Sequence, residues 1–125
     1  MKMPSPNQVR CSLLTLSLVL YPYVAPATTV QVHVGQGATL TFTPDTVSIQ
    51  PGDMVEWIWD DNGHSVTSGT PGNPDGTFDS GLQGIPFTFS HTFPMAGSFP
   101  YYCIRHQAMM VGTVNVEAPA SQFAT

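Results

Sequence analysis

The 125-residue sequence predicts an all-β domain folded as a sandwich or a barrel. Apolar and polar residues alternate over several short stretches, which is the period of a half-buried strand. Clusters of Gly and Pro separate these stretches, and the twelve prolines and eleven glycines of the chain favour turns over helix interiors. No stretch of useful length shows a helical period, and the length is that of a single domain.

The expected strands are short and follow one another along the chain. They are predicted at residues 30–34, 40–42, 46–49, 54–59, 87–93, 99–103 and 113–116. Turns are predicted between them at residues 35–37, 50–53, 70–76 and 94–97. The polar segment 67–84 is expected to be a loop with one short strand near Phe78. Pro100 lacks a backbone N–H, so it is expected to interrupt the strand before Cys103 or to leave it unpaired there.

The first 27 residues are predicted to be a secretory signal peptide. Lys2 and Arg10 carry positive charge, residues 11–20 form an apolar run, and Ala25-Pro26-Ala27 places small residues where a signal peptidase cuts. The run is shorter than the ~20 residues that cross a bilayer; a first strand or a buried helix is the alternative. We therefore expect export to the periplasm or the extracellular space, a folded domain over residues 28–117, and a flexible tail over residues 118–125.

The mature chain is expected to be strongly acidic. Cleavage after Ala27 removes Lys2 and Arg10. Arg105 is then the one basic residue besides the histidines, all eight acidic residues remain, and the net charge becomes −7. Nucleic acids and anionic membrane surfaces are bound by clustered Lys and Arg side chains, which this chain lacks. The composition therefore argues against both kinds of partner.

One sulfur and two imidazoles suggest a metal site. Cleavage leaves Cys103 as the only cysteine. In an exported chain, a single thiol is either buried as a small apolar side chain or occupied by a function such as metal binding. His106 follows three residues later, Met110 follows after four more, and His64 comes after the Trp-rich strand. A thiolate, two imidazoles and a weak thioether form the donor set of electron-transfer copper sites, whereas structural zinc prefers four strong ligands and calcium prefers oxygen. The pattern predicts one copper ion.

The residues around these donors carry a resemblance to a known family. The run Tyr101-Tyr102-Cys103-x-x-His106, a methionine, Gly112-x-Val114-x-Val116 and the upstream Asn62-Gly63-His64 resemble the cupredoxins of the plastocyanin, pseudoazurin and azurin group. The similar features span roughly residues 28–116. The resemblance implies a Greek-key β-sandwich or barrel of about seven to eight strands, with a cupredoxin-like copper-binding domain over residues 28–117.

The resemblance also implies the ligands and the function. His64, Cys103, His106 and a methionine carry over as ligands of one type 1 copper ion. Met110 is favoured because it fits the family's Met-x-Gly spacing before Gly112, and Met109, which fits the shortest family loops counted from His106, is the alternative axial ligand. The implied function is an exported blue copper protein that carries single electrons between redox partners and is not an enzyme. A copper chaperone or sequestering module without redox turnover is the alternative.

Several neighbouring residues have expected roles. His106, framed by Ala108, Met109 and Val111, is expected to be the point where a redox partner docks transiently with a monomeric protein. Ser65 is expected to hydrogen-bond the loop that bears Cys103. Arg105 stands where the family often has a proline, and its positive charge should raise the reduction potential. His33 and His91 are not expected to be ligands, and His91 should lie at the edge of the core. Trp57 and Trp59 are expected to be core residues.

Overall fold

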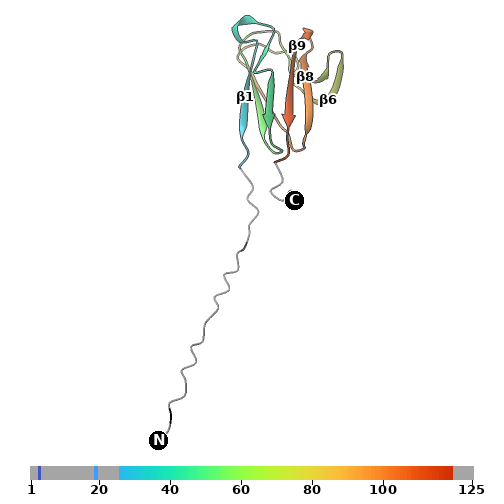
Figure 1. The fold of residues 1–125 in the computed structure, drawn as a ribbon. Helices are drawn as coiled ribbons and strands as arrows, with labels where there is room; N and C mark the ends of the chain where they lie inside the picture. Colours follow the sequence, from blue (N-terminus) through green and yellow to red (C-terminus); the bar gives the residue numbers. More distant parts are fainter. Residues whose placement is uncertain (1–2, 4–18, 20–25, 120–125) are drawn as a thin grey trace.

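Nine strands form two sheets that pack face to face in the computed structural model, which describes Met3, Val19 and residues 26–119 (Figure 1). The first sheet has the order β2 (Phe42–Thr43), β1 (Thr29–Val34), β4 (Met54–Trp59) and β7 (Thr88–Thr92). The second has the order β3 (Thr46–Ile49), β9 (Gln107–Val116), β8 (Gly97–Cys103), β5 (Thr67–Thr70) and β6 (Asn73–Asp79). The only helical element in the described residues is a 3-10 turn at Gln36–Ala38. The all-β prediction is confirmed.

The predicted terminal segments lie mostly outside the described residues. Of the predicted signal peptide, the structure describes only Met3, Val19, Pro26 and Ala27. Of the predicted tail, it describes only Ala118 and Pro119.

The core lies between the two sheets and is rich in aromatic side chains. On β4, alternate residues point inward, so that Val55, Trp57 and Trp59 are buried. The Trp57 ring lies 5.4 Å from the Tyr101 ring in a T-shaped arrangement and 5.5 Å from the Phe78 ring. The predicted core positions of both tryptophans are therefore confirmed.

The segment 67–84 differs from the sequence prediction. It contains two strands, β5 and β6, which pair as a hairpin with Thr70 opposite Asn73. Pro71 and Gly72 connect them, and the φ of 78° at Gly72 suits the third position of a type II turn. Pro74 and Gly76 are tolerated within β6 because β6 is the edge strand of its sheet. The predicted short strand near Phe78 is confirmed as β6, but β5 was not predicted, and it helps bring the number of strands in the described residues to nine.

The strand is not interrupted at Pro100, and of the two expected outcomes only the lack of pairing holds, on the β5 side alone. Strand β8 runs without a break, with Pro100 opposite Thr113 of β9. The Thr113 N–H donates to Asp45 O at 2.8 Å, away from β8, so Pro100 and Thr113 form a pair without mutual hydrogen bonds. The Pro100 nitrogen therefore faces the β5 side, where pairing begins only at Tyr101. Its missing N–H removes no bond between β8 and β9.

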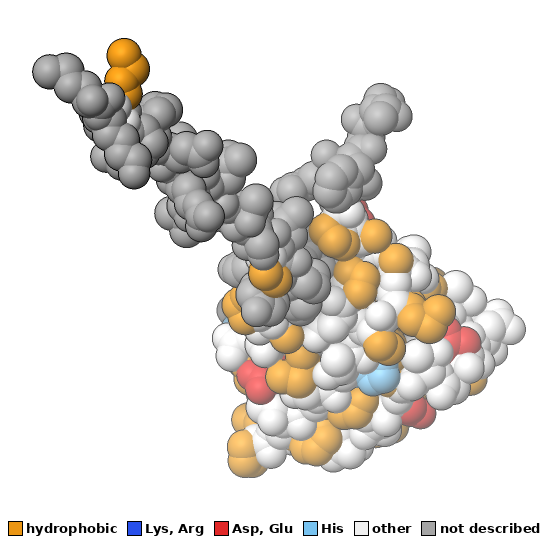
Figure 2. Space-filling model, turned by 90° about the horizontal axis from the view of Figure 1, so that it is seen from below, with side chains coloured by type: hydrophobic (Ala, Val, Ile, Leu, Met, Phe, Trp, Pro, Cys, Tyr) orange, Lys and Arg blue, Asp and Glu red, His pale blue; other side chains and the backbone are white. Residues whose placement is uncertain are grey.

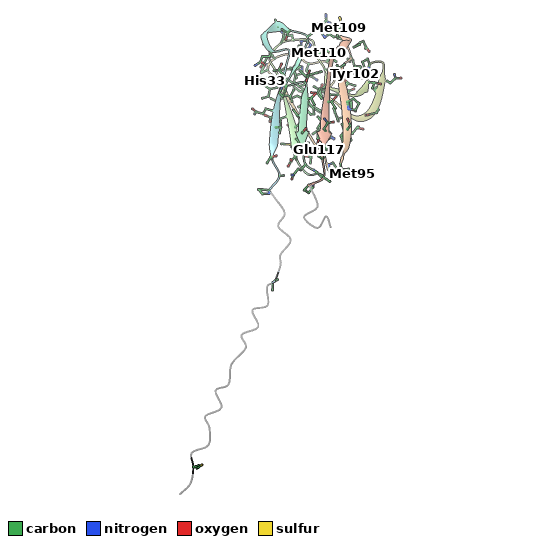
Figure 3. All side chains as sticks on the ribbon, in the orientation of Figure 1. His33, Met95, Tyr102, Met109, Met110 and Glu117 are labelled. Carbon is green, nitrogen blue, oxygen red and sulfur yellow. The ribbon has the colours of Figure 1, made fainter. Side chains whose placement is uncertain are left out.

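The described chain ends leave the sandwich at one end, and the turn between β8 and β9 lies at the other (Figure 1). Met109 and Met110 lie near this turn, whereas Met95 and Glu117 lie at the end where the chain leaves (Figure 3). Seen from the latter end, hydrophobic and acidic side chains and a histidine are in view among the described residues, with no Lys or Arg (Figure 2). Arg105, the only basic residue besides histidine among the described residues, lies in the turn at the opposite end.

Asp53 fixes the start of β1, and its replacement yields a testable prediction. Its carboxylate accepts the backbone N–H groups of Thr28 and Gln50, both at 2.9 Å, and these bonds hold the pKa of Asp53 below its usual range. The stabilisation is present above the pKa of the unfolded chain and disappears as the pH falls through the lower folded pKa. Asp53→Asn is expected to unfold at a lower temperature than the wild type at pH 7. As the pH falls through the lowered pKa of the folded state, the two proteins should converge; a constant difference across the pH range in thermal unfolding would contradict this.

Candidate metal centre

Three donor side chains from two parts of the chain meet at the end of the sandwich. The ligand atoms of His64, Cys103 and His106 all lie within 4.8 Å of one another. Cys103 ends β8 and is fully buried, and His64, in the connection between β4 and β5, is 2 % exposed. The Cys103 Sγ lies 3.4 Å from His106 Nδ1, and the two imidazole rings lie 5.1 Å apart. The structure therefore brings together the three residues that the sequence singled out.

The His64 ring is buried without a hydrogen-bond partner. Neither Nδ1 nor Nε2 has a partner among the described residues, and Nε2 lies 3.9 Å from Asp61 Oδ2. A buried polar atom without a partner costs stability, so such an atom facing a thiol and a second imidazole fits a metal ligand. Burial lowers the pKa of the His64 imidazole, and the charges of His106 and Arg105 act in the same direction. These causes favour the neutral ring, which is the form that binds a metal.

Ser65 joins the two ligand-bearing segments. Its backbone N–H donates to Cys103 Sγ at 3.4 Å, and its hydroxyl oxygen accepts the N–H of Ile104 at 2.9 Å. These two hydrogen bonds tie the segment that follows His64 to Cys103 and to the residue after it. The expected contact of Ser65 with the Cys103 loop is confirmed.

The turn after Cys103 is tight. His106 N–H donates to Cys103 O at 3.2 Å, and Met109 N–H donates to His106 O at 3.1 Å. Gln107, directly after His106, has a φ of 51°, a left-handed conformation that few residues other than Gly adopt readily. Pairing of β9 with β8 begins at this residue, opposite Cys103, so only Ile104, Arg105 and His106 lie between the two strands. The short connection keeps His106 beside Cys103.

The two candidate methionines differ in burial. Met110 is 1 % exposed and packs in the core, whereas its neighbour Met109 is 70 % exposed. Adjacent residues of a strand point to opposite faces, so only one of the pair can face inward at this position. The inward side chain is Met110, which the Met-x-Gly spacing favours.

The other two histidines lie apart from the three donors. His33 Nδ1 lies 2.7 Å from Asp60 Oδ2 on the surface. The His91 ring packs 4.9 Å from Phe78 and 4.8 Å from Phe93, and burial lowers its pKa. The predicted place of His91 at the core edge is confirmed.

Two glycines beside the site were not predicted to matter. A Cβ at Gly35 would lie 2.8 Å from His64 Nε2, and a Cβ at Gly63 would lie 2.6 Å from Arg105 Nη1. Both residues have positive φ angles, 74° and 77°. The sequence marks Gly35 only as a turn residue. Its contact with His64 arises only in the folded chain, where the connection after β4 places the His64 ring against Gly35.

Fold and donors together define a class. A thiol and two imidazoles that meet at one end of two packed β-sheets are the features of a mononuclear type 1 copper protein with a cupredoxin fold. The chain belongs to the copper binding proteins of the plastocyanin/azurin family, whose family model matches residues 28–117. The His64–Cys103–His106 cluster fits the single type 1 copper ion of this family.

Similar proteins are known from several organisms. A plastocyanin of Nostoc punctiforme is 32% identical over 139 aligned residues, covering 94% of this chain and 99% of that protein. Two solved structures share the fold. A purple cupredoxin from Nitrosopumilus maritimus is 28% identical, with a TM-score of 0.60 and coverage of 70% of this chain and 98% of its own. Oxidised plastocyanin from Dryopteris crassirhizoma is 26% identical, with a TM-score of 0.58 and coverage of 70% and 100%.

Proposed function

We propose that this chain is an exported type 1 copper protein that carries single electrons between redox partners, with His64, Cys103, His106 and Met110 as ligands. The observation that carries the proposal is the meeting of three donor atoms within 4.8 Å, at a site where His64 and Cys103 are buried. The chemistry that copper supplies when bound is a one-electron change between Cu(I) and Cu(II). The family consists of electron carriers, so we propose no catalytic activity for the chain.

The residues of the chain hold the donors in place for this change. Ser65 bonds both Cys103 and Ile104, and the short turn fixes His106 beside the thiol. A preformed donor set needs little rearrangement between the two oxidation states, which is the property that a fast electron carrier requires. Burial of His64 and Cys103 excludes water from two of the donors.

We propose that electrons pass through His106 to a partner that docks around it. His106 is partly exposed, whereas His64 and Cys103 are buried. Exposed apolar side chains lie next to it in sequence, and Met109 and Val111 line a shallow pocket of about 190 Å³ with Leu40. A small apolar surface forms a weak contact that dissociates quickly. The acidic mature chain would steer a basic partner, so the association rate should fall as salt is added.

Export rests on the N-terminal sequence and on similarity to a plastocyanin. We propose a signal peptide at residues 1–27, the copper domain at residues 28–117 and a tail at residues 118–125. No helix among the described residues is long and apolar enough to span a membrane. N-terminal sequencing of the protein expressed from its full gene tests the proposal, which requires the mature chain to begin with Thr28.

Voltammetry distinguishes an electron carrier from a copper-sequestering protein. The mature chain loaded with Cu(II) should become blue and cycle reversibly by one electron, with fast self-exchange between its oxidised and reduced forms. A chain that binds copper but exchanges electrons sluggishly would support a chaperone or sequestering function. A chain that stays colourless with Cu(II) would overturn both the ligand set and the function.

The axial ligand can be tested with two neighbouring substitutions. Met110→Leu is expected to raise the reduction potential, because loss of the thioether disfavours Cu(II), by roughly 60 mV for each tenfold loss of Cu(II) affinity relative to Cu(I). Met109→Leu is the matched control and should leave the potential nearly unchanged, since Met109 is 70 % exposed. The reverse result, measured by voltammetry, would assign the axial position to Met109.

The charge of Arg105 gives a further prediction. Its guanidinium lies against Gly63, next to His64, where a positive charge favours Cu(I) over Cu(II). Arg105→Gln is expected to lower the reduction potential by a few tens of millivolts, because the charge interaction in solvent is about 1 kcal/mol or less. Arg105→Lys keeps the charge and is the control. The difference between the two variants should shrink at high salt; equal potentials at low salt would refute a charge effect.

A further inference from the structure

A line of hydrogen bonds leads from the ligand turn to a carboxylate on another strand. The Ile104 N–H donates to the Ser65 hydroxyl oxygen at 2.9 Å. The Ser65 hydroxyl lies 2.9 Å from the Thr67 hydroxyl, and the Thr67 hydroxyl donates to Asp79 Oδ1 at 3.0 Å. Ser65 is fully buried and Thr67 is 2 % exposed. The line thus connects a residue beside Cys103 to the end of β6 through the protein interior.

The groups at its ends determine the direction of every bond in this line. A carboxylate accepts hydrogen bonds and donates none, so the Thr67 hydroxyl proton is taken up by its bond to Asp79. The bond between the two hydroxyls must then be donated by Ser65, whose only hydroxyl proton is used in it. The Ser65 oxygen is left to accept from Ile104. Asp79 therefore decides which way the Ser65 hydroxyl points.

We propose that Asp79 is a positioning residue of the metal centre, acting through Thr67 and Ser65 on Cys103 and Ile104. Ser65 contacts the ligand turn twice, with its N–H on the Cys103 sulfur and its oxygen on Ile104 N–H. A hydroxyl held by Thr67 keeps the Ser65 side chain in one rotamer and its oxygen free for Ile104. The copper readouts of this proposal rest on the proposed function, but the hydrogen-bond line belongs to the chain itself.

A second aspartate on the same strand provides a matched comparison. Asp75 also lies on β6 and also accepts a hydrogen bond from a buried hydroxyl, that of Ser68. Apart from Asp75, the Ser68 hydroxyl forms hydrogen bonds only with the backbone of Phe78. The hydrogen bonds of Asp75 and Ser68 to each other and to Phe78 therefore stay within the β5–β6 hairpin. Asp79 and Asp75 thus differ in whether their hydrogen bonds reach the ligand turn. Replacing either by Ala removes one negative charge and one hydrogen-bond acceptor from the same strand.

Amide hydrogen exchange in the copper-free chain tests the line without any metal. Asp79→Ala and Thr67→Val should each speed exchange at Ile104 several-fold relative to Trp59, whose N–H bonds Phe87 O in the other sheet. Asp75→Ala should leave this ratio unchanged, and Thr67→Ser, which keeps the hydroxyl, should restore it. Equal effects of Asp79→Ala and Asp75→Ala on Ile104 would overturn the proposal, because Asp79 would then support only the hairpin.

Reduction potentials of the copper-loaded variants test whether Asp79 acts through Thr67. Asp79→Ala should shift the potential in the wild-type background, and a smaller shift is expected when Thr67 is already Val. A through-space charge effect would persist unchanged in the Thr67→Val background, and that result would overturn the proposal. If the wild-type chain does not bind copper as a blue protein, the proposed function fails, while the exchange measurements still decide the role of Asp79.

Discussion

Cys103→Ser is expected to abolish the blue colour of the copper-loaded chain. The colour of such sites comes from charge transfer between a thiolate and copper, and Cys103 is the only free cysteine among the described residues. A serine oxygen is a hard and weakly acidic donor, so the two imidazoles would remain without the sulfur that selects copper. Visible absorption of wild type and variant, titrated with Cu(II) under the same conditions, checks the prediction.

The copper-free form of this variant should still fold. Serine is close to cysteine in size, and its oxygen can accept the Ser65 N–H that the sulfur now accepts. His33→Ala is a control for loss of an imidazole outside the site, since His33 contacts Asp60 on the surface, and it should leave the colour intact. An intense blue Cys103→Ser protein would show that the sulfur of Cys103 is not the ligand.

Gly112→Ala is expected to destabilise the whole domain. A Cβ at Gly112 would lie 2.3 Å from Tyr101 Cζ and 2.5 Å from Tyr101 Oη. The Tyr101 ring cannot retreat, because it is 1 % exposed and packs 4.7 Å from Phe42 and 5.4 Å from Trp57. Overpacking of this kind costs about 1–3 kcal/mol, and the stiff surroundings place Gly112→Ala at the upper end of that range.

Urea unfolding of the copper-free chain measures this loss. Gly76→Ala is a useful comparison, because a Cβ there meets nothing within 4 Å and only the positive φ of 78° opposes it. Its cost should be about 1–2 kcal/mol. If Gly112→Ala unfolds at the same urea concentration as the wild type, then the packing of Tyr101 is looser than its contacts indicate.

The strands that could be predicted are those in which apolar and polar residues alternate along the sequence, because one face of the strand packs into the core. Strand β4 alternates buried and partly buried residues, and its expected bounds agree with the structure. Strands β5 and β6 carry no such period, because β5 buries Thr67 and Ser68 through hydrogen bonds to Asp79 and Asp75 instead of apolar contacts. A pattern of hydrophobicity does not show polar burial of this kind, so β5 was not predicted, and β6 was expected only as a short strand near Phe78.

The donors were easier to predict than their surroundings. Cys103 and His106 are three residues apart in one turn, so spacing alone brings them together, and the family resemblance supplied His64 from 39 residues away. The space at Gly35 and the reach of Asp79 depend on how distant segments fold over one another. Neither has a local signal, because glycine and aspartate are ordinary residues in turns and on edge strands.

The placement of the chain ends governs how this protein could be attached to a surface or to another protein. Residues 26 and 119 leave the sandwich at the end away from the turn that bears His106 (Figure 1). A fusion or tag at either terminus would leave the turn around His106 uncovered, so the proposed redox partner should still be able to dock there in solution. The same attachment to an electrode would hold His106 far from the metal surface, and current should then require a soluble mediator.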